Sequence, residues 1–198
     1  MKKFNLKFSC VLLLMIFFTG CAENKSSAPV YSGNGNTYDI LIDHFSAREF
    51  DSGRVSREEI DLILMAGLRA PSSGNRQPWH FTVVEDEALA RQLVPQSGSG
   101  NVLFLISAAA DDPENNSEIL DTAMAVHSIY LAAQAIGLGS RIYTNPVSSI
   151  NSRFLPQLGI PPGHSVIAVV RVGRLSPNMD AFTTSSPRHS MESSVTFR

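Results

Sequence analysis

Hydrophobic positions along the chain follow two different spacings, which alternate from about Tyr38 onward. Apolar residues three and four positions apart mark one face of a helix, and the clearest case follows the Ser56–Glu59 capping box and ends near Ala70. Short, nearly continuous apolar runs bounded by turn residues mark buried strands. The pattern predicts strands at residues 79–84, 102–108, 141–143 and 166–172, and further helices at residues 38–45, 87–94, 118–136 and 148–155.

The order of these elements predicts an α+β fold. Helices and strands mix without the regular strand–helix–strand rhythm of a doubly wound parallel sheet. The helix over residues 118–136 is apolar on most sides, which implies either central burial or a subunit interface. The pattern leaves both of these interpretations open.

The first twenty residues have a different pattern, typical of an export signal. Lys2, Lys3 and Lys7 precede the largely apolar run Phe8–Phe18, and the segment has no acidic residue. The apolar run would span roughly 16 Å as a helix, about half of a bilayer's hydrocarbon core, so it is too short for a transmembrane helix. A buried helix of the folded domain is the other interpretation.

The end of this run resembles the bacterial lipobox, in which the signal is cut just before a lipidated cysteine. Phe18 departs from the usual leucine, whereas Thr19 and Gly20 are small and Cys21 is present. We therefore expect residues 1–20 to be a lipoprotein signal peptide and Cys21 to carry the lipid. This predicts an exported protein anchored to a bacterial membrane, on its periplasmic or extracellular face. A simple secretory signal cut nearby is the alternative.

Residues 21–37 are predicted to be a flexible tether, and residues 38–198 the folded domain. The tether is rich in serine, glycine and asparagine and has few apolar residues. A coil of this length reaches roughly 20 to 25 Å, which is enough to hold a domain away from a lipid surface.

The overall composition indicates a single globular domain. The 198 residues carry a net charge of −2, and 43% are apolar while 17% are charged, which argues against a polybasic nucleic-acid binder. The two cysteines are Cys10, inside the predicted signal, and Cys21, so the mature protein has no thiol for a disulfide or a catalytic cysteine. The five histidines are scattered without the spacing of metal ligands, and the common dinucleotide, phosphate-loop, zinc-protease and serine-hydrolase motifs are absent.

Three separated segments carry candidate chemistry. They are residues 44–50 (HFSAREF), 70–81 (APSSGNRQPWHF) and 186–188 (SPR). Together they resemble the nitroreductase family of FMN-dependent oxidoreductases, and the string P-S-S-x-N-x-Q-P-W-x-F between a helix and a strand is the most specific part. The resemblance covers residues 38–198. It implies a nitroreductase-like fold with a mostly antiparallel sheet flanked by helices, and a homodimer with FMN at its interface.

The resemblance implies that Ser46, Arg48 and Arg188 hold the FMN phosphate. A phosphate with nearly two negative charges suits guanidinium forks and a hydroxyl donor, although each arginine taken alone is typical of a solvated surface. His44 stands where the family usually has arginine, and it is either a weaker phosphate ligand or a capping or core histidine. Glu49 adds a negative charge where basic residues are common.

The middle segment and the strand at 141–143 supply the other cofactor residues that the resemblance implies. Pro71, Ser72, Ser73 and Asn75 present polar groups to the FMN bound mainly by the other subunit, and Gln77 braces their loop, although by composition alone the segment is an ordinary turn. Thr144 and Asn145 fall where the family places a backbone N–H near flavin N5, in positions where relatives often have glycine.

The implied activity is electron transfer through bound flavin to a small acceptor such as a nitroaromatic, a quinone or another flavin, with no obligatory catalytic acid or base. The donor is NAD(P)H or another reductant, since predicted export separates the protein from cytoplasmic NAD(P)H. The alternative is a non-catalytic, membrane-anchored flavin-binding lipoprotein. His44, Glu49 and the lack of glycine at Thr144 and Asn145 favour that alternative.

Overall fold

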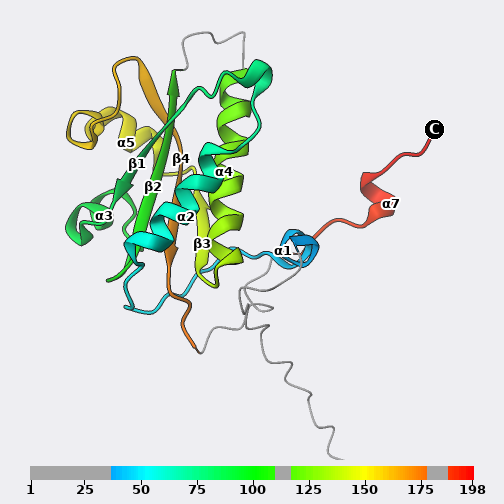
Figure 1. Ribbon diagram of the computed structural model, residues 1–198, viewed down its shortest axis with the longest axis horizontal. Coiled ribbons are helices and arrows are strands. Elements are labelled where there is room, and N and C mark those ends of the chain that lie inside the picture. Colours follow the sequence, from blue (N-terminus) through cyan, green and yellow to red (C-terminus); the bar gives the residue numbers. More distant parts are fainter. Residues whose placement is uncertain (1–36, 110–116, 178–186) are drawn as a thin grey trace, which may run out of the picture.

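The computed structural model describes residues 37–109, 117–177 and 187–198. The predicted signal, Cys21, Ser186 and all of the predicted tether except Thr37 lie outside these residues. The described strands are β1 (Trp79–Val84), β2 (Val102–Ala109), β3 (Gly139–Tyr143) and β4 (His164–Gly173), and they form one sheet in the order β1-β2-β4-β3 (Figure 1). Every neighbouring pair of these strands is antiparallel. The predicted α+β class and antiparallel sheet are therefore confirmed.

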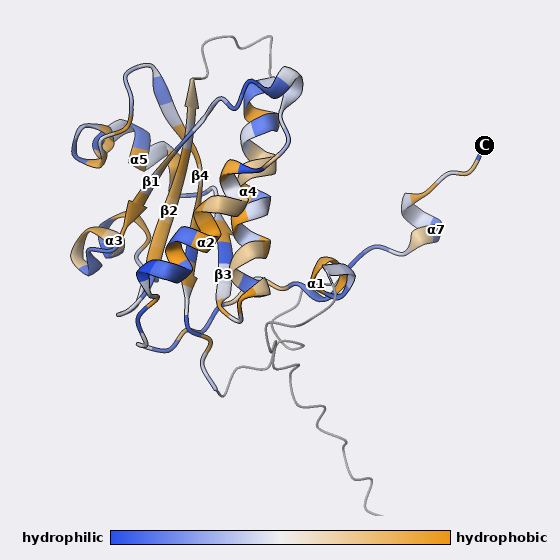
Figure 2. Cartoon of the chain, in the orientation of Figure 1, coloured by the Kyte–Doolittle hydropathy of each residue, from blue (hydrophilic) through white to orange (hydrophobic). Residues whose placement is uncertain are grey.

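Helices cover both faces of the sheet, so its central strands are buried on both sides. Phe104 and Ile106 of β2 pack with α2 (Arg57–Leu68) and α4 (Ser117–Ala135), whereas Leu103 and Leu105 pack with α3 (Glu87–Leu93) and α5 (Val147–Arg153). This alternation is the two-residue period of a strand. Both faces of β2 need apolar side chains, and Figure 2 shows the strand as hydrophobic along its length.

The shorter elements complete the fold. They are α1 (Thr37–Asp43), η1 (Ser73–Asn75), η2 (Leu155–Leu158) and α7 (Met191–Ser194). Helix α2 begins at the predicted capping box, in which the Ser56 hydroxyl accepts from the Glu59 N–H and the Glu59 carboxylate accepts from the Ser56 N–H. None of the helices in the described ranges is long and apolar enough to cross a membrane.

Several boundaries differ by one or two residues from the sequence prediction, and two of them bear on the site. The helix predicted at 38–45 ends at Asp43, because the buried amide of Gln134 pairs with both backbone groups of Phe45 and so replaces its helical hydrogen bonds. Strand β3 begins at Gly139, two residues before the predicted start of this strand at residue 141. The long helix itself is both buried and exposed: Ile129 and Ala133 lie in the core, while Leu120 and Met124 are exposed.

The C-terminal arm, residues 187–198, leaves the domain and carries α7 into solvent (Figure 1). All twelve of its residues are exposed, including the apolar side chains of Met191, Val195 and Phe197. The apolar side chains of the arm are therefore exposed and could be buried only against another surface.

A glycine contact joins the loop before β2 to the segment before α2. Gly100 has φ +76°, and a Cβ added there would lie 2.5 Å from the Ser52 carbonyl oxygen and 2.6 Å from that of Gly53. We expect Gly100→Ala to lower the free energy of unfolding by about 3 kcal/mol, because it adds left-handed strain and a backbone clash.

Gly159 is a matched control for this substitution. It has φ +64° with no atom within 4 Å of an added Cβ, so Gly159→Ala carries the strain alone, about 1 kcal/mol. Urea denaturation of the two variants measures the difference. Equal losses would contradict the close packing of Gly100 against residues 52–53.

Candidate functional site

The segment after α1 presents two of the predicted phosphate ligands to solvent. Burial alternates along it, with Phe45 and Ala47 buried and Ser46 and Arg48 exposed, as in an extended strand. The Ala47 N–H donates to the Ser140 carbonyl at 2.9 Å, which fixes this alternation against the start of β3. Within the described part of the chain, the Ser46 and Arg48 side chains form no hydrogen bond or ion pair, so both are available to a ligand.

Gln134 of α4 holds this segment through side-chain hydrogen bonds. Its side-chain oxygen accepts from the Phe45 N–H at 3.2 Å, and its amide nitrogen donates to the Phe45 carbonyl at 3.0 Å and to the Ser140 hydroxyl at 2.9 Å. The Ser140 hydroxyl in turn donates to the Tyr130 carbonyl at 2.7 Å. Buried polar groups that are all satisfied in this way define one backbone position.

His44 contacts the protein in the way expected of a capping histidine. Its Nδ1 lies 3.0 Å from the Leu41 carbonyl at the end of α1, and its half-buried ring packs edge-on against Tyr130 and His127 of α4. Burial and then the neighbouring His44 lower the pKa of His127. These contacts fit His44 as a cap at the end of α1. The ring also lies next to the segment that carries Ser46 and Arg48.

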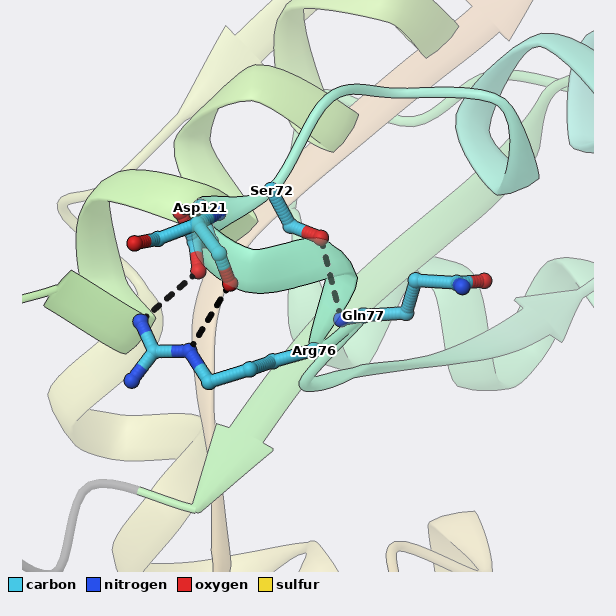
Figure 3. A network of polar contacts seen from close by, with 5 residues as sticks. Ser72, Arg76, Gln77 and Asp121 are labelled. Atoms are coloured by element: carbon cyan, nitrogen blue, oxygen red, sulfur yellow. Dashed lines mark hydrogen bonds and ion pairs between the residues drawn. The ribbon is translucent and has the colours of Figure 1, made fainter.

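The loop at residues 71–77 is held by hydrogen bonds of its own (Figure 3). The Gln77 N–H donates to the Ser72 hydroxyl at 3.1 Å, and the Gln77 side chain donates to the Asn75 side-chain oxygen at 3.0 Å. Gln77 therefore braces the loop as expected. Gly74, Asn75 and Gln77 all have positive φ, which the two non-glycine residues adopt at a cost of about 1 kcal/mol each. The exposed side of this loop includes Pro71, Ser73 and Asn75.

Asp121 of α4 anchors the same loop to the domain (Figure 3). Its side-chain oxygens accept from the Ser73 N–H at 2.9 Å and from the Arg76 guanidinium at 3.0 Å, and the Arg76 Nε donates to the Ser73 carbonyl at 3.2 Å. Asp121 is only 7% exposed. The Ser73 hydrogen bond first, and then Arg76, hold the pKa of Asp121 below its ordinary value in spite of burial.

The two candidate segments attach to opposite ends of α4. Asp121 holds the 71–77 loop near the start of the helix, and Gln134 holds the 44–48 segment near its end. The two anchors are thirteen positions apart along the helix, which corresponds to about 20 Å. One subunit therefore does not bring the two candidate sets together.

The remaining candidates also lie apart. Thr144 and Asn145 are exposed at the far end of β3, roughly 13 Å along the strand from Ser140. Arg188 is exposed near the start of the C-terminal arm, which extends away from the domain that carries Ser46 and Arg48 (Figure 1). The structure thus shows four separate groups of candidates.

Sequence reasoning missed the residues that position these groups, Gln134, Asp121 and Arg76. A signal was present, because Gln134 and Asp121 are polar residues within a helix that is apolar on most sides, and a buried polar side chain needs a partner. The partners themselves, at positions 45 and 73, are far away in the sequence and carry no matching pattern.

The amino-acid sequence is similar to those of known proteins. The model of the nitroreductase family matches residues 42–102 and 98–174. An Archaeoglobus fulgidus protein assigned as an NADH dehydrogenase/NAD(P)H nitroreductase is 34% identical over 137 residues, which cover 65% of this chain and 79% of that protein. The oxygen-insensitive NAD(P)H nitroreductase of Salmonella typhimurium is 36% identical over 66 residues, covering 33% of this chain and 30% of that protein.

Solved structures share its fold. A nitroreductase with bound FMN from Bacteroides fragilis superposes with a TM-score of 0.68 at 19% identity, covering 83% of this chain and 100% of that one. An FMN-dependent nitroreductase from Clostridium difficile gives a TM-score of 0.66 at 24% identity, covering 81% and 98%. The family model spans well over half of the sequence and the backbone superposes on that of family members, so the chain belongs to the nitroreductase family.

Proposed function

We propose that this protein is an FMN-dependent oxidoreductase that works as a homodimer. Electrons pass through FMN held between the subunits to a small acceptor such as a nitroaromatic, a quinone or a flavin. Family membership supports this function, as do the FMN-bound structures that share the fold.

The separation of the two candidate segments along α4 carries the proposal. A two-fold axis that sets two α4 helices antiparallel would bring the Asp121 end of one helix beside the Gln134 end of the other. Each FMN would then meet Ser46 and Arg48 of one subunit and the 71–77 loop of its partner. The geometry of one chain alone leaves each set incomplete.

Exposed apolar side chains supply a surface for such a dimer. They lie on α2, on the first half of α4 and on the arm, and include Leu62, Met65, Leu68, Leu120, Met124 and Phe197. Helices α2 and α4 pack against each other on the same face of the sheet (Figure 2), so a partner could cover exposed residues of both helices. A second copy of the chain would bury these residues and give the arm a surface to cover.

The residues of this chain would bind and orient the cofactor. The Ser46 hydroxyl and the Arg48 guanidinium face outward without partners in the described ranges, which fits a phosphate, and Arg188 of the arm would add a second guanidinium. The rigid 71–77 loop offers backbone and amide donors, and the backbone at Thr144 and Asn145 would lie near the reacting edge of the ring. Bound FMN would supply the hydride-accepting and hydride-donating chemistry. The protein would leave one face of the ring open to donor and acceptor in turn.

The predicted export signal bears on which electron donor reduces the FMN. We infer that residues 1–20 direct export and that Cys21 is lipidated, so the domain works at a membrane surface where NAD(P)H is scarce. A membrane or periplasmic reductant, such as a quinol, would then replace the nicotinamide donor. The alternative function is a flavin-binding lipoprotein without turnover, and the use of His44 as a cap on α1 favours it, since that ring replaces a phosphate-binding arginine.

Anaerobic reduction of the FMN-loaded protein tests the function. We expect NADH, NADPH or a quinol to bleach the visible absorbance of the oxidised flavin, and a quinone or a nitroaromatic to restore it. The three donors are compared in parallel by stopped flow. A flavin that stays oxidised with every donor contradicts the enzyme and leaves the flavin-binding alternative.

Binding of FMN by the arginines is a second prediction. Arg188→Ala should weaken FMN binding by about tenfold or more, as expected for loss of a charge-assisted phosphate contact. Arg57→Ala is the control, because Arg57 lies on the exposed side of α2 and, among the described residues, pairs only with Asp61 in the next turn. Fluorescence titration measures both affinities. Equal effects would remove Arg188 from the phosphate site, and a colourless protein that takes up no FMN would contradict both flavin functions.

The anchoring of the 71–77 loop gives a third prediction. Asp121→Asn should keep the fold but lose the ion pair with Arg76, and FMN should bind roughly tenfold more weakly, the equivalent of one charge-assisted hydrogen bond. Hydrogen exchange at the Ser73 N–H should rise in the variant. Asp61→Asn, on the exposed side of α2, is the matched control, and an unchanged FMN affinity in Asp121→Asn would show that the loop does not need this anchor.

The same carboxylate predicts a pH dependence of the loop. Because the pKa of Asp121 is lowered in the folded protein, its stabilising effect is fully present above the ordinary value of 3.8 and is lost as the pH falls through the lowered pKa. Loop exchange in the wild type should therefore approach that of Asp121→Asn in acid.

Lipidation is tested by labelling cells with an acyl-chain probe. The wild-type protein should incorporate the label and sediment with membranes, whereas Cys21→Ser should do neither. Labelling of Cys21→Ser at the wild-type level would contradict attachment at this residue.

A further inference from the structure

A buried arginine in the middle of the sheet has no role in the proposed flavin chemistry. Arg171 lies in β4 and is only 2% exposed. Its guanidinium donates to the Gln96 carbonyl and, at 3.3 Å, to the Arg48 carbonyl, while its Nε is buried without an acceptor in the described part of the chain. A guanidinium has five N–H donors, so most of its hydrogen-bonding capacity is unused.

The positive charge of Arg171 is also uncompensated. No carboxylate among the described residues forms an ion pair with it, and the positive charge of Arg141 acts on it as well. The guanidinium instead lies over the Phe50 ring at 4.2 Å and the Tyr143 ring at 5.6 Å. Burial, and to a smaller extent Arg141, lowers the pKa of Arg171, yet an arginine stays charged at neutral pH. Such a buried cation is costly unless an anion reaches it.

A cavity beside Arg171 gives an anion that access. It measures about 410 Å³, opens to solvent, and is lined by Arg48, Glu49, Phe50, Asn101 and Arg171 among others. Asn101 is buried as well, and its side-chain Nδ2 has no acceptor in the described ranges. Two guanidinium groups and an amide with spare donors therefore meet at one cavity.

We propose that this cavity binds the oxyanion group of a small molecule, a carboxylate or a phosphate, which pairs with Arg171 and Arg48. The exposed carboxylate of Glu49 lines the same cavity and competes with the ligand for these cations. Of the residues assigned above to FMN, Arg48 alone lines this cavity, so the site is adjacent to the cofactor phosphate and separate from it. The carbonyls of Gln96 and Arg48 position the Arg171 guanidinium, and the remaining N–H donors receive the anion.

Binding of simple anions to FMN-saturated protein tests the site. Inorganic phosphate and sodium acetate are compared with sodium chloride at equal ionic strength, by thermal shift and by calorimetry. We expect phosphate, acetate or both to raise the melting temperature saturably above the chloride value, and their relative affinities identify the oxyanion class. No stabilisation beyond that of chloride would overturn the proposal.

Three variants assign the binding to this cavity. Arg171→Met should weaken oxyanion binding at least about tenfold, and Glu49→Gln, an exposed substitution that does not depend on repacking the core, should strengthen it severalfold by removing a competing negative charge. Arg57→Gln, on the exposed side of α2, should leave oxyanion binding unchanged. Unchanged affinity in Glu49→Gln, or an equal loss in Arg57→Gln, would contradict the site.

Competition with FMN separates this inference from the proposed function. If phosphate displaces FMN, the anion binds in the cofactor site, and the proposal of a separate anion site is overturned. Phosphate binding that depends on Arg171 in a protein that takes up no FMN would instead support the cavity while the flavin function fails.

Discussion

The hydrogen bonds at the two ends of the buried helix α4 hold the proposed cofactor segments in place. Near one end, the Gln134 amide pairs with both backbone groups of Phe45, and near the other, Asp121 takes the Ser73 N–H and the Arg76 guanidinium. Both side chains are buried, so breaking either contact would leave polar groups without water to replace it. The placement of α4 against the sheet therefore sets the positions of the two segments together.

This arrangement explains why a small domain would need a partner. The two anchors are about 20 Å apart on a single helix, and α4 and α2 carry apolar side chains that are exposed in the described part of the chain. A dimer that buries these side chains would also bring the two separated segments together. Burial of the interface and assembly of the cofactor site would then be one event.

The charged side chains of the protein differ in how they are compensated. Arg174 meets both oxygens of Glu59 at 2.7 and 2.8 Å, and Arg76 meets Asp121, and in each case a partly exposed arginine meets a less exposed acid. Arg171 is more deeply buried than either arginine, and in the described ranges it donates to carbonyls and lies over aromatic rings but forms no ion pair. A buried cation without an ion-pair partner fits the proposed binding of an anion from solution.

The sequence by itself determined the elements and the family, because both depend on local pattern. The two-residue and 3.6-residue periods place the strands and helices to within a few residues, and the string from Pro71 to Phe81 identifies the nitroreductase family. Only the tertiary structure decided that Phe45 leaves the helix and that Asp121 and Gln134 anchor segments distant in the sequence. It also decided that Arg171 lies beside a cavity without an ion-pair partner among the described residues. These features depend on contacts between residues about 45 to 125 positions apart, and no local period encodes which distant group a buried polar side chain will meet.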